Sequence, residues 1–132
     1  MLIYSMGVSV DGFIADREGA FGWTAPSEEL FRFHTALVSE LGAICAAAGC
    51  TRRCCRGRRI RRCARTSFGA AFADVWCAIP KVVFSRTLDS VQGNARLAEA
   101  SLAEEAAAAL AATDKDVAIV VRRVGVMSLK PC

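Results

Sequence analysis

Three polar residues, Ser85, Arg86 and Thr87, stand where an apolar run beginning at Lys81 ends. The run Lys81 to Ser85 has the pattern of a buried strand, so the three side chains begin the loop that follows it. Two hydroxyls and a guanidinium form a donor set suited to a phosphate group. A solvated turn is the alternative, and the spacing alone leaves both interpretations open.

Three further side chains have the chemistry of a binding site, and each also has a purely structural explanation. Glu28 stands in the first turn of an expected helix, where the helix dipole favours a carboxylate with or without a substrate. Asp11 and Gly12 are typical of a tight turn. Trp23 is equally suited to a core. His34, the one histidine, has no serine or cysteine partner in a nucleophile motif, which argues against a catalytic role.

The stretch 44–66 differs from the rest of the chain. It holds eight of the seventeen basic residues and five of the seven cysteines (Cys45, Cys50, Cys54, Cys55, Cys63). The cysteines show no C-x2-C spacing and have no histidine nearby, which argues against a metal site. The arginines would attract a nucleic-acid backbone, but no aromatic residue is interleaved to stack on a base, so a nucleic-acid partner is not favoured. Because unpaired arginines do not enter a core, 44–66 is expected to be exposed, irregular or disordered.

The whole chain has the composition of one modest globular domain. It has 132 residues, of which 54% are hydrophobic, and a formal net charge of +4. The stretch 44–66 carries +8 of this, which leaves −4 for the remainder. The sequence has no apolar run long enough to span a membrane, and no basic segment precedes the apolar start. A cytoplasmic protein with reduced thiols and no membrane contact is therefore expected.

Strand and helix patterns alternate along the chain. Strands are expected over 2–9, 81–85 and 116–121, and helices over 27–41, 68–79 and 101–113. In the first helix, helical spacing relates Leu30, Phe33, Leu37 and Leu41, and Phe31 and Val38 widen the apolar face. The alternation predicts an α/β layered domain with a mostly parallel sheet.

Three motifs, taken in order, resemble a known family. They are the run Tyr4-Ser-Met-Gly-Val-Ser-Val-Asp-Gly-Phe-Ile-Ala15, the loop from Gly22-Trp23 through Glu28-Glu29-Leu30 to Phe33-His34, and the segment from Trp76 through Ile-Pro-Lys-Val-Val-Phe-Ser-Arg-Thr to Leu88. Together they resemble the dihydrofolate-reductase-like superfamily, and most of all small bacterial proteins similar to the reductase domain of the riboflavin-biosynthesis deaminase-reductase. The resemblance covers roughly residues 1–43 and 67–119.

The resemblance implies a single reductase-like domain that binds NADPH at the carboxyl ends of its strands. It implies hydride transfer from NADPH to a small molecule, either pterin-like or a ribosylaminopyrimidine. It also implies homodimerisation, for which the sequence fixes no interface. The implied cofactor-binding residues are Ser85, Arg86 and Thr87 at the adenosine phosphate and Ile14 and Ala15 against the nicotinamide. On the substrate side, the implied residues are Glu28 as the substrate-binding acid and catalytic candidate, with Asp11 and Trp23.

The stretch 44–66 departs from the family pattern. The family has a Gly-Arg-Arg-x-Tyr-Glu type motif after the first helix, whereas this chain reads Ile44-Cys-Ala-Ala-Ala-Gly-Cys-Thr-Arg-Arg-Cys-Cys-Arg56. Codons built from each third base and the next two bases permit Leu-Cys-Gly-Arg-Arg-Leu-Tyr-Glu here. We therefore favour the hypothesis that 44–66 is read in a shifted frame, with the usual frame resuming near Ser67.

The carboxyl-terminal sequence departs in the same way. After the strand expected to begin at Asp116 the family has a Gly-Gly pair, whose backbone can approach a pyrophosphate closely, but this chain has Val120 and Val121. The chain then stops before the family's last strands, so the domain is expected to be truncated or frame-shifted there, with an unpaired sheet edge. Weak or absent NADPH binding is the expectation for this polypeptide, with a noncatalytic remnant or a small basic nucleic-acid-binding module as the alternatives.

Overall fold

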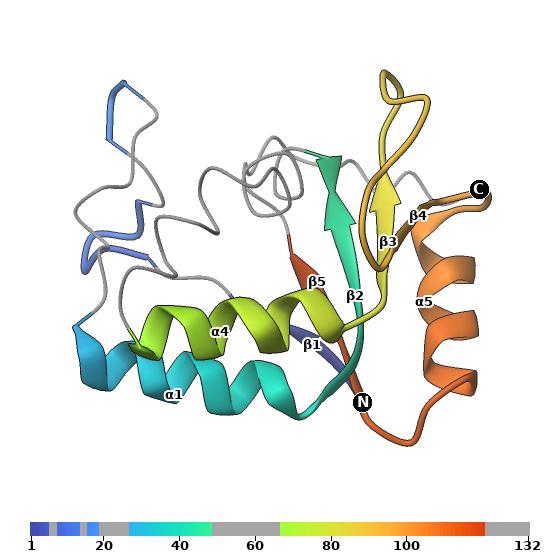
Figure 1. Ribbon diagram of the computed structural model, residues 1–132. Coiled ribbons are helices and arrows are strands. Elements are labelled where there is room, and N and C mark those ends of the chain that lie inside the picture. The colour runs from blue at the N-terminus through green and yellow to red at the C-terminus, as the bar shows by residue number, and fades with distance from the viewer. Residues whose placement is uncertain (6–7, 14–15, 19–26, 49–66, 121–132) are drawn as a thin grey trace.

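The computed structural model describes residues 1–5, 8–13, 16–18, 27–48 and 67–120, which form an α/β fold (Figure 1). The sheet has five strands: β1 (Leu2–Tyr4), β2 (Leu41–Ala47), β3 (Lys81–Phe84), β4 (Ala95–Leu97) and β5 (Asp116–Val120). The three described helices are α1 (Glu28–Ser39), α4 (Ser67–Ala78) and α5 (Leu102–Ala111). None of these helices combines the length and the apolar content that a bilayer crossing requires.

The strands lie in the order β1-β5-β2-β3-β4, and every pairing between neighbours is parallel. The expectation of an α/β fold with a mostly parallel sheet is therefore confirmed. Helices α1 and α4 cover one face of the sheet and α5 covers the other (Figure 1). Because the strands are parallel, their carboxyl ends meet at one edge of the sheet.

Two helices begin at the residues that the sequence indicates. Ser27 caps α1, where its Oγ accepts a hydrogen bond of 3.3 Å from the amide of Leu30. Ser101 and Glu104 form a reciprocal capping box at the start of α5. Each cap satisfies backbone N–H groups that have no partner within the helix.

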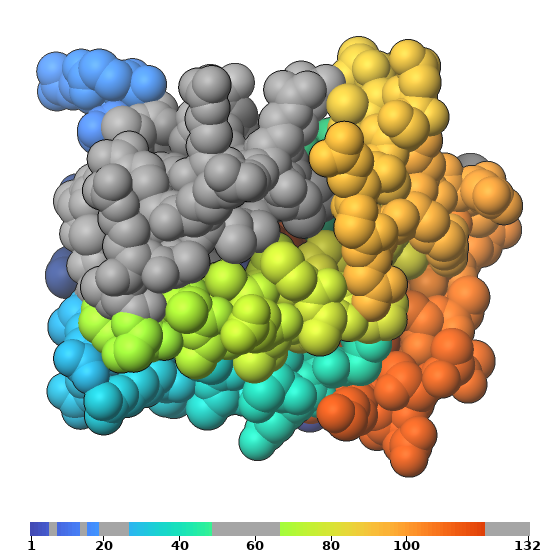
Figure 2. Space-filling model, in the orientation of Figure 1, coloured from blue at the N-terminus to red at the C-terminus, as the bar shows by residue number. Residues whose placement is uncertain are grey.

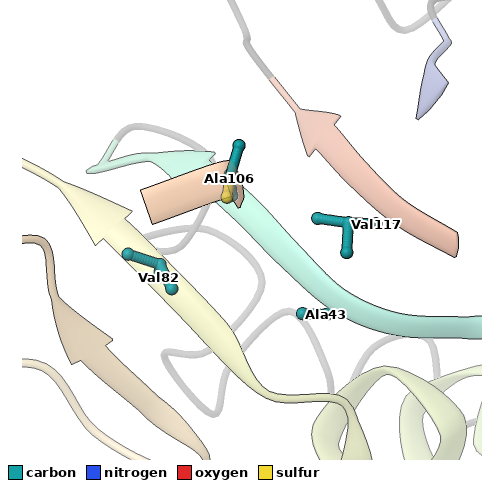
Figure 3. Packing of buried hydrophobic residues seen from close by; sticks show 5 residues of the cluster. Ala43, Val82, Ala106 and Val117 are labelled. Atoms are coloured by element: carbon teal, nitrogen blue, oxygen red, sulfur yellow. The ribbon is translucent and has the colours of Figure 1, made fainter. Parts of the chain in front are cut away.

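Alternate residues of the central strands fill two cores. Ala43, Cys45, Val82, Val117 and Ala106 pack together on the α5 face of the sheet. Figure 3 shows the small side chains of β2, β3 and β5 gathered beneath Ala106 of α5. The opposite face packs against α4, and its buried members are Ile44, Ala46, Trp76, Ile79 and Ala118. The alternation along β2 follows from the two-residue period of a strand.

A buried lysine closes the carboxyl end of α4. The side chain of Lys81 is only 3% exposed, and its Nζ donates to the backbone carbonyls of Trp76 and of Ile79, the latter at 2.7 Å. Nζ also lies 5.3 Å from the centre of the Trp76 ring. Carbonyls at the end of a helix lack intrahelical partners, so the ammonium supplies what the last turn needs.

Helix α1 packs through a different part of its surface from the one that its leucine spacing indicates. Leu30, Phe33 and Leu37 are 43%, 57% and 45% exposed. Phe31 is instead half-buried and meets two phenylalanine rings of α4 edge to face, at centroid distances of 5.5 and 5.3 Å. The expected apolar face is therefore confirmed at Phe31 and Val38 and wrong at Leu30, Phe33 and Leu37, because both sides of α1 carry large apolar residues and the position of α4 decides which side is covered.

The expectation that 44–66 is exposed, irregular or disordered is wrong for its first residues. Residues 44–47 belong to β2, a central strand, and Ile44, Cys45 and Ala46 are at most 1% exposed. The charged part of the stretch begins only at Arg52, so nothing prevents the residues before it from being buried. Residues 49–66 lie outside the described part of the chain.

Other expected boundaries also differ. The first helix ends at Ser39, and Leu41 begins β2. The first strand is shorter than expected, because β1 ends at Tyr4 and Ser9 belongs to a turn closed by the bond from the Gly12 amide to the Ser9 carbonyl. Gly12 adopts a φ of 87°, a conformation that favours glycine. Phe13, which follows Gly12, is 63% exposed.

Candidate functional site

The Ser85–Thr87 turn lies at the carboxyl edge of the sheet. Strand β3 ends at Phe84, and the register of β2 against β3 pairs Ala47 with Phe84. On the other side of β3, the amide of Ala98 donates to the carbonyl of Val83 at 2.9 Å, so the end of β4 runs beside the end of β3. In open sheets of parallel strands, ligands bind outside this edge.

The Ser85 side chain organises the turn. Its Oγ accepts hydrogen bonds from the backbone amides of Thr87 at 3.1 Å and Leu88 at 3.0 Å. Accepting two N–H groups leaves the hydroxyl proton of Ser85 as a donor. Arg86 and Thr87 are exposed and Ser85 is half-buried. In Figure 2 the loop after β3 stands out at the surface, in yellow and orange.

A second polar cluster lies at the start of α5 and at the end of β4, the strand that pairs with β3. The carboxylate of Glu105 is 4% exposed and accepts two hydrogen bonds from the guanidinium of Arg96, of which Nη1 to Oε1 measures 3.1 Å. Its Oε1 also accepts the backbone amides of Glu99 at 2.8 Å and Ala100 at 3.3 Å. One carboxylate therefore joins β4, the segment after β4 and α5.

These hydrogen bonds change the protonation equilibria of the cluster. Hydrogen bonds from Arg96 and from the Glu99 amide lower the pKa of Glu105 to about 2. The bond to Glu105 in turn raises the pKa of Arg96. Cys45 lies on the same face of the sheet, where burial raises the pKa of its thiol and the Glu105 carboxylate raises it further. A buried thiol with a raised pKa is a poor nucleophile.

The structure does not bring Glu28 or Asp11, the two described substrate-side candidates, to the Ser85–Thr87 turn. Glu28 is exposed at the start of α1 and forms an ion pair of 2.5 Å with Arg32, one turn further on. Asp11 is exposed in the loop after β1, and its carboxylate accepts the hydroxyl of Ser9 at 2.6 Å. Figure 1 shows the loop after β1 and the loop after β3 at opposite sides of the molecule.

Three of the candidate residues fall outside the described ranges. They are Ile14, Ala15 and Trp23, so the expected nicotinamide side of the site is not described. Within the described ranges, no group of three or more His, Cys, Asp or Glu side chains is placed to hold a metal ion.

The Arg96–Glu105 pair is the part of this edge that sequence reasoning missed. One signal for it was present: Glu105 lies among Leu102, Ala106 and Ala109, at helical spacing on the apolar side of α5. A carboxylate at such a position requires a buried partner. The partner was not evident because β4 has only three residues, too few for a periodic pattern.

Comparison with known proteins adds no assignment to this geometry. No protein-family model matches the sequence, and a search of curated proteins finds no match.

Proposed function

We propose that this chain is a dihydrofolate-reductase-like domain of the riboflavin-biosynthesis reductase type, whose Ser85–Thr87 turn is the site for the 2′-phosphate of NADPH. The observation that carries the proposal is the position of this turn, directly after a buried strand and at the carboxyl edge of an open parallel sheet. When bound, NADPH would supply a hydride to a pterin-like or ribosylaminopyrimidine substrate.

The residues of the turn fit a phosphate monoester. Arg86 is exposed, so its guanidinium is able to contact two phosphate oxygens at once. The hydroxyl proton of Ser85 adds a neutral donor, because the Ser85 oxygen already accepts two backbone amides. The same two bonds hold the turn in one conformation before a ligand arrives, which reduces the entropy lost on binding.

The layers of the fold also support the proposal. Helices lie on both faces of the sheet, as the doubly wound reductase domain requires. The dihydrofolate-reductase-like arrangement of the layers is part of the proposal, together with a small-molecule substrate and a homodimeric assembly.

The register of β2 explains why this polypeptide is expected to bind NADPH weakly. Ala47 pairs with Phe84, so the residue after Ala47 lies at the same edge as Ser85. In the shifted reading frame, the Gly-Arg-Arg sequence would stand immediately at the end of β2. The glycine would let the backbone approach a phosphate closely, and the arginines would add charge. The chain as read supplies alanines there.

The experiment that tests the proposed site measures NADPH and NADH binding to a version with 44–66 in the shifted frame, by nucleotide fluorescence. Arg86→Gln should weaken NADPH binding about tenfold and leave NADH binding nearly unchanged, because only NADPH carries the 2′-phosphate. Arg17→Gln, at an exposed position after β1, is the control. Equal loss for both nucleotides would exclude a 2′-phosphate role for Arg86.

A DNA titration of the chain as it is read separates the enzyme from a nucleic-acid-binding module, because the shifted frame replaces the arginine-rich sequence. DNA binding by the arginines in 52–65 would weaken steeply with salt. Saturable NADPH binding with no such DNA binding favours the reductase.

A further inference from the structure

We propose that Glu105 is a positioning residue, whose buried carboxylate acts as a built-in anion at the start of α5 and holds the segment 98–101 beside the Ser85–Thr87 turn. The role in ligand binding rests on the proposed function, whereas the role in holding the segment does not. Neither the capping box nor the three motifs of the sequence include this residue.

The donors at the start of α5 are those of an anion-binding site. They comprise the Arg96 guanidinium and the backbone amides of Glu99 and Ala100, and all of them point to the carboxylate of Glu105. Such a combination of guanidinium and amide groups is what phosphates and carboxylates bind at helix starts. Here the chain supplies the anion itself.

The neighbouring backbone amides of Ser101 and Glu104 also donate to side chains of the chain itself. The amide of Ser101 donates to Oε2 of Glu104 at 3.0 Å, and the amide of Glu104 donates to Oγ of Ser101 at 3.3 Å. Two carboxylates of α5 thus satisfy the backbone groups that precede the helix. An external phosphate would therefore have to compete with the chain's own carboxylates for the donors of residues 96–101, which makes Glu105 a determinant of where the phosphate binds.

The connection from Glu105 to the turn runs through the strand register. Val83 pairs with Leu97, and the Ala98 amide donates to the Val83 carbonyl. The residues after β4 therefore run alongside the residues after β3. The Glu105 carboxylate accepts the backbone amides of Glu99 and Ala100, the two residues that follow Ala98. Loss of the carboxylate should therefore loosen segment 98–101 and, beside it, the Ser85–Thr87 turn.

The charged groups around Glu105 are of both signs. Arg96 comes from β4, Glu99 from the segment after β4 and Glu104 from α5 itself, while the titratable but uncharged thiol of Cys45 comes from β2. Glu105→Gln keeps the size of the side chain and removes the charge that Arg96 faces. Glu29→Gln is the matched control, because Glu29 is an exposed carboxylate in the first turn of α1, on the opposite face of the sheet.

The first experiment is chemical rescue. The thermal midpoint of Glu105→Ala is measured with and without formate at constant ionic strength, beside the unmodified chain and Glu29→Ala. Formate should raise the midpoint of Glu105→Ala by several degrees and leave the other two nearly unchanged, which a packing role alone would not produce. An equal effect in all three proteins, or a Glu105→Ala protein that formate does not restore, overturns the built-in anion.

The second experiment uses the isosteric variant, which is the safer one for folding. In Glu105→Gln the amides of Glu99 and Ala100 should exchange with solvent about tenfold faster than in the unmodified chain, and the amide resonances of Ser85–Thr87 should shift. Glu29→Gln should change neither. Unchanged exchange overturns the role of Glu105 in holding the segment, and unmoved Ser85–Thr87 resonances overturn its link to the turn.

A ligand titration distinguishes this inference from the proposed function. Adenosine 2′-phosphate should move the Ser85–Thr87 resonances in the unmodified chain and move them at least about threefold less, at equal concentration, in Glu105→Gln. If it moves them in neither protein, the proposed function fails, while the formate and exchange results still decide the built-in anion. If it moves them equally in both, Glu105 does not position the site.

Discussion

The Arg96 guanidinium on β4 and the Glu105 carboxylate on α5 form a two-bond ion pair, in which the carboxylate is buried and the guanidinium is half-exposed. Pairs of this geometry are stronger than single ion pairs at a surface. This one joins an edge strand of three residues to a helix on the neighbouring face.

The pair predicts a stability change at acid pH. The pKa of Glu105 falls from its ordinary 4.5 to about 2 in the folded chain. A carboxylate whose pKa is lowered by folding contributes stability that is complete above pH 4.5 and is lost as the pH falls through about 2. The difference in free energy of unfolding between the unmodified chain and Glu105→Gln should therefore shrink over this interval. Urea titrations at a series of pH values measure it, and a difference that stays constant contradicts the assignment.

The packing of α1 predicts unequal effects for two phenylalanines on one helix. Phe31 meets two aromatic rings of α4, whereas Phe33 is 57% exposed. Phe31→Ala should destabilise the chain by about 2–3 kcal/mol and Phe33→Ala by less than about 1 kcal/mol, because cavity formation requires burial. Chemical denaturation of the two variants provides the comparison. Equal losses, or a larger loss at Phe33, would show that α1 packs through its other face.

The approach of Gly42 to Thr113 predicts a steric cost. A Cβ added at Gly42 would lie 2.4 Å from Oγ1 and 2.5 Å from Cγ2 of Thr113. Gly42→Ala should therefore destabilise the chain by about 1–3 kcal/mol, since the α5–β5 connection must shift. Thr113→Ala should reduce that cost in the double variant, by at least about 0.5 kcal/mol of coupling. Strictly additive effects in the double-mutant cycle would mean that the two residues do not meet.

Two cysteines are predicted to react at very different rates. Cys77 is exposed on α4, while Cys45 is 1% exposed and has a thiol pKa raised by burial. Iodoacetamide should alkylate Cys77 in the folded chain at least about a hundredfold faster than Cys45. Peptide mass spectrometry follows each site separately, and unfolding in urea should remove most of the difference. Rapid labelling of Cys45 in the folded chain would place β2 outside the core.

The parts of the fold that sequence reasoning predicted correctly are set by local interactions. Ser27 and the Ser101–Glu104 pair mark helix starts because the caps lie within four residues of the groups they satisfy. The Ser85–Thr87 turn was placed at the end of a strand for the same reason, since the apolar run before it is continuous.

The parts that were missed depend on partners distant in the sequence. Strand β2 shows no alternation of apolar and polar residues in its sequence, since it is buried on both faces between β5 and β3. The covered side of α1 depends on where α4 lies. Arg96 and Glu105 come together only through the register of β4 and the placement of α5, and no local pattern in either segment specifies that contact.

The most direct test of the proposed function is a fluorescence titration of NADPH against the chain as it is, beside a version with residues 44–66 in the shifted frame. Saturable binding is expected for the shifted-frame version and weak or no binding for the unmodified chain, because the end of β2 beside Ser85 lacks the glycine and arginines that would contact the phosphates. Equal binding by both would show that the stretch 44–66 is a tolerated part of a working site and that the reading-frame hypothesis is wrong. Binding by neither would contradict the assignment of this domain to the NADPH-dependent reductases.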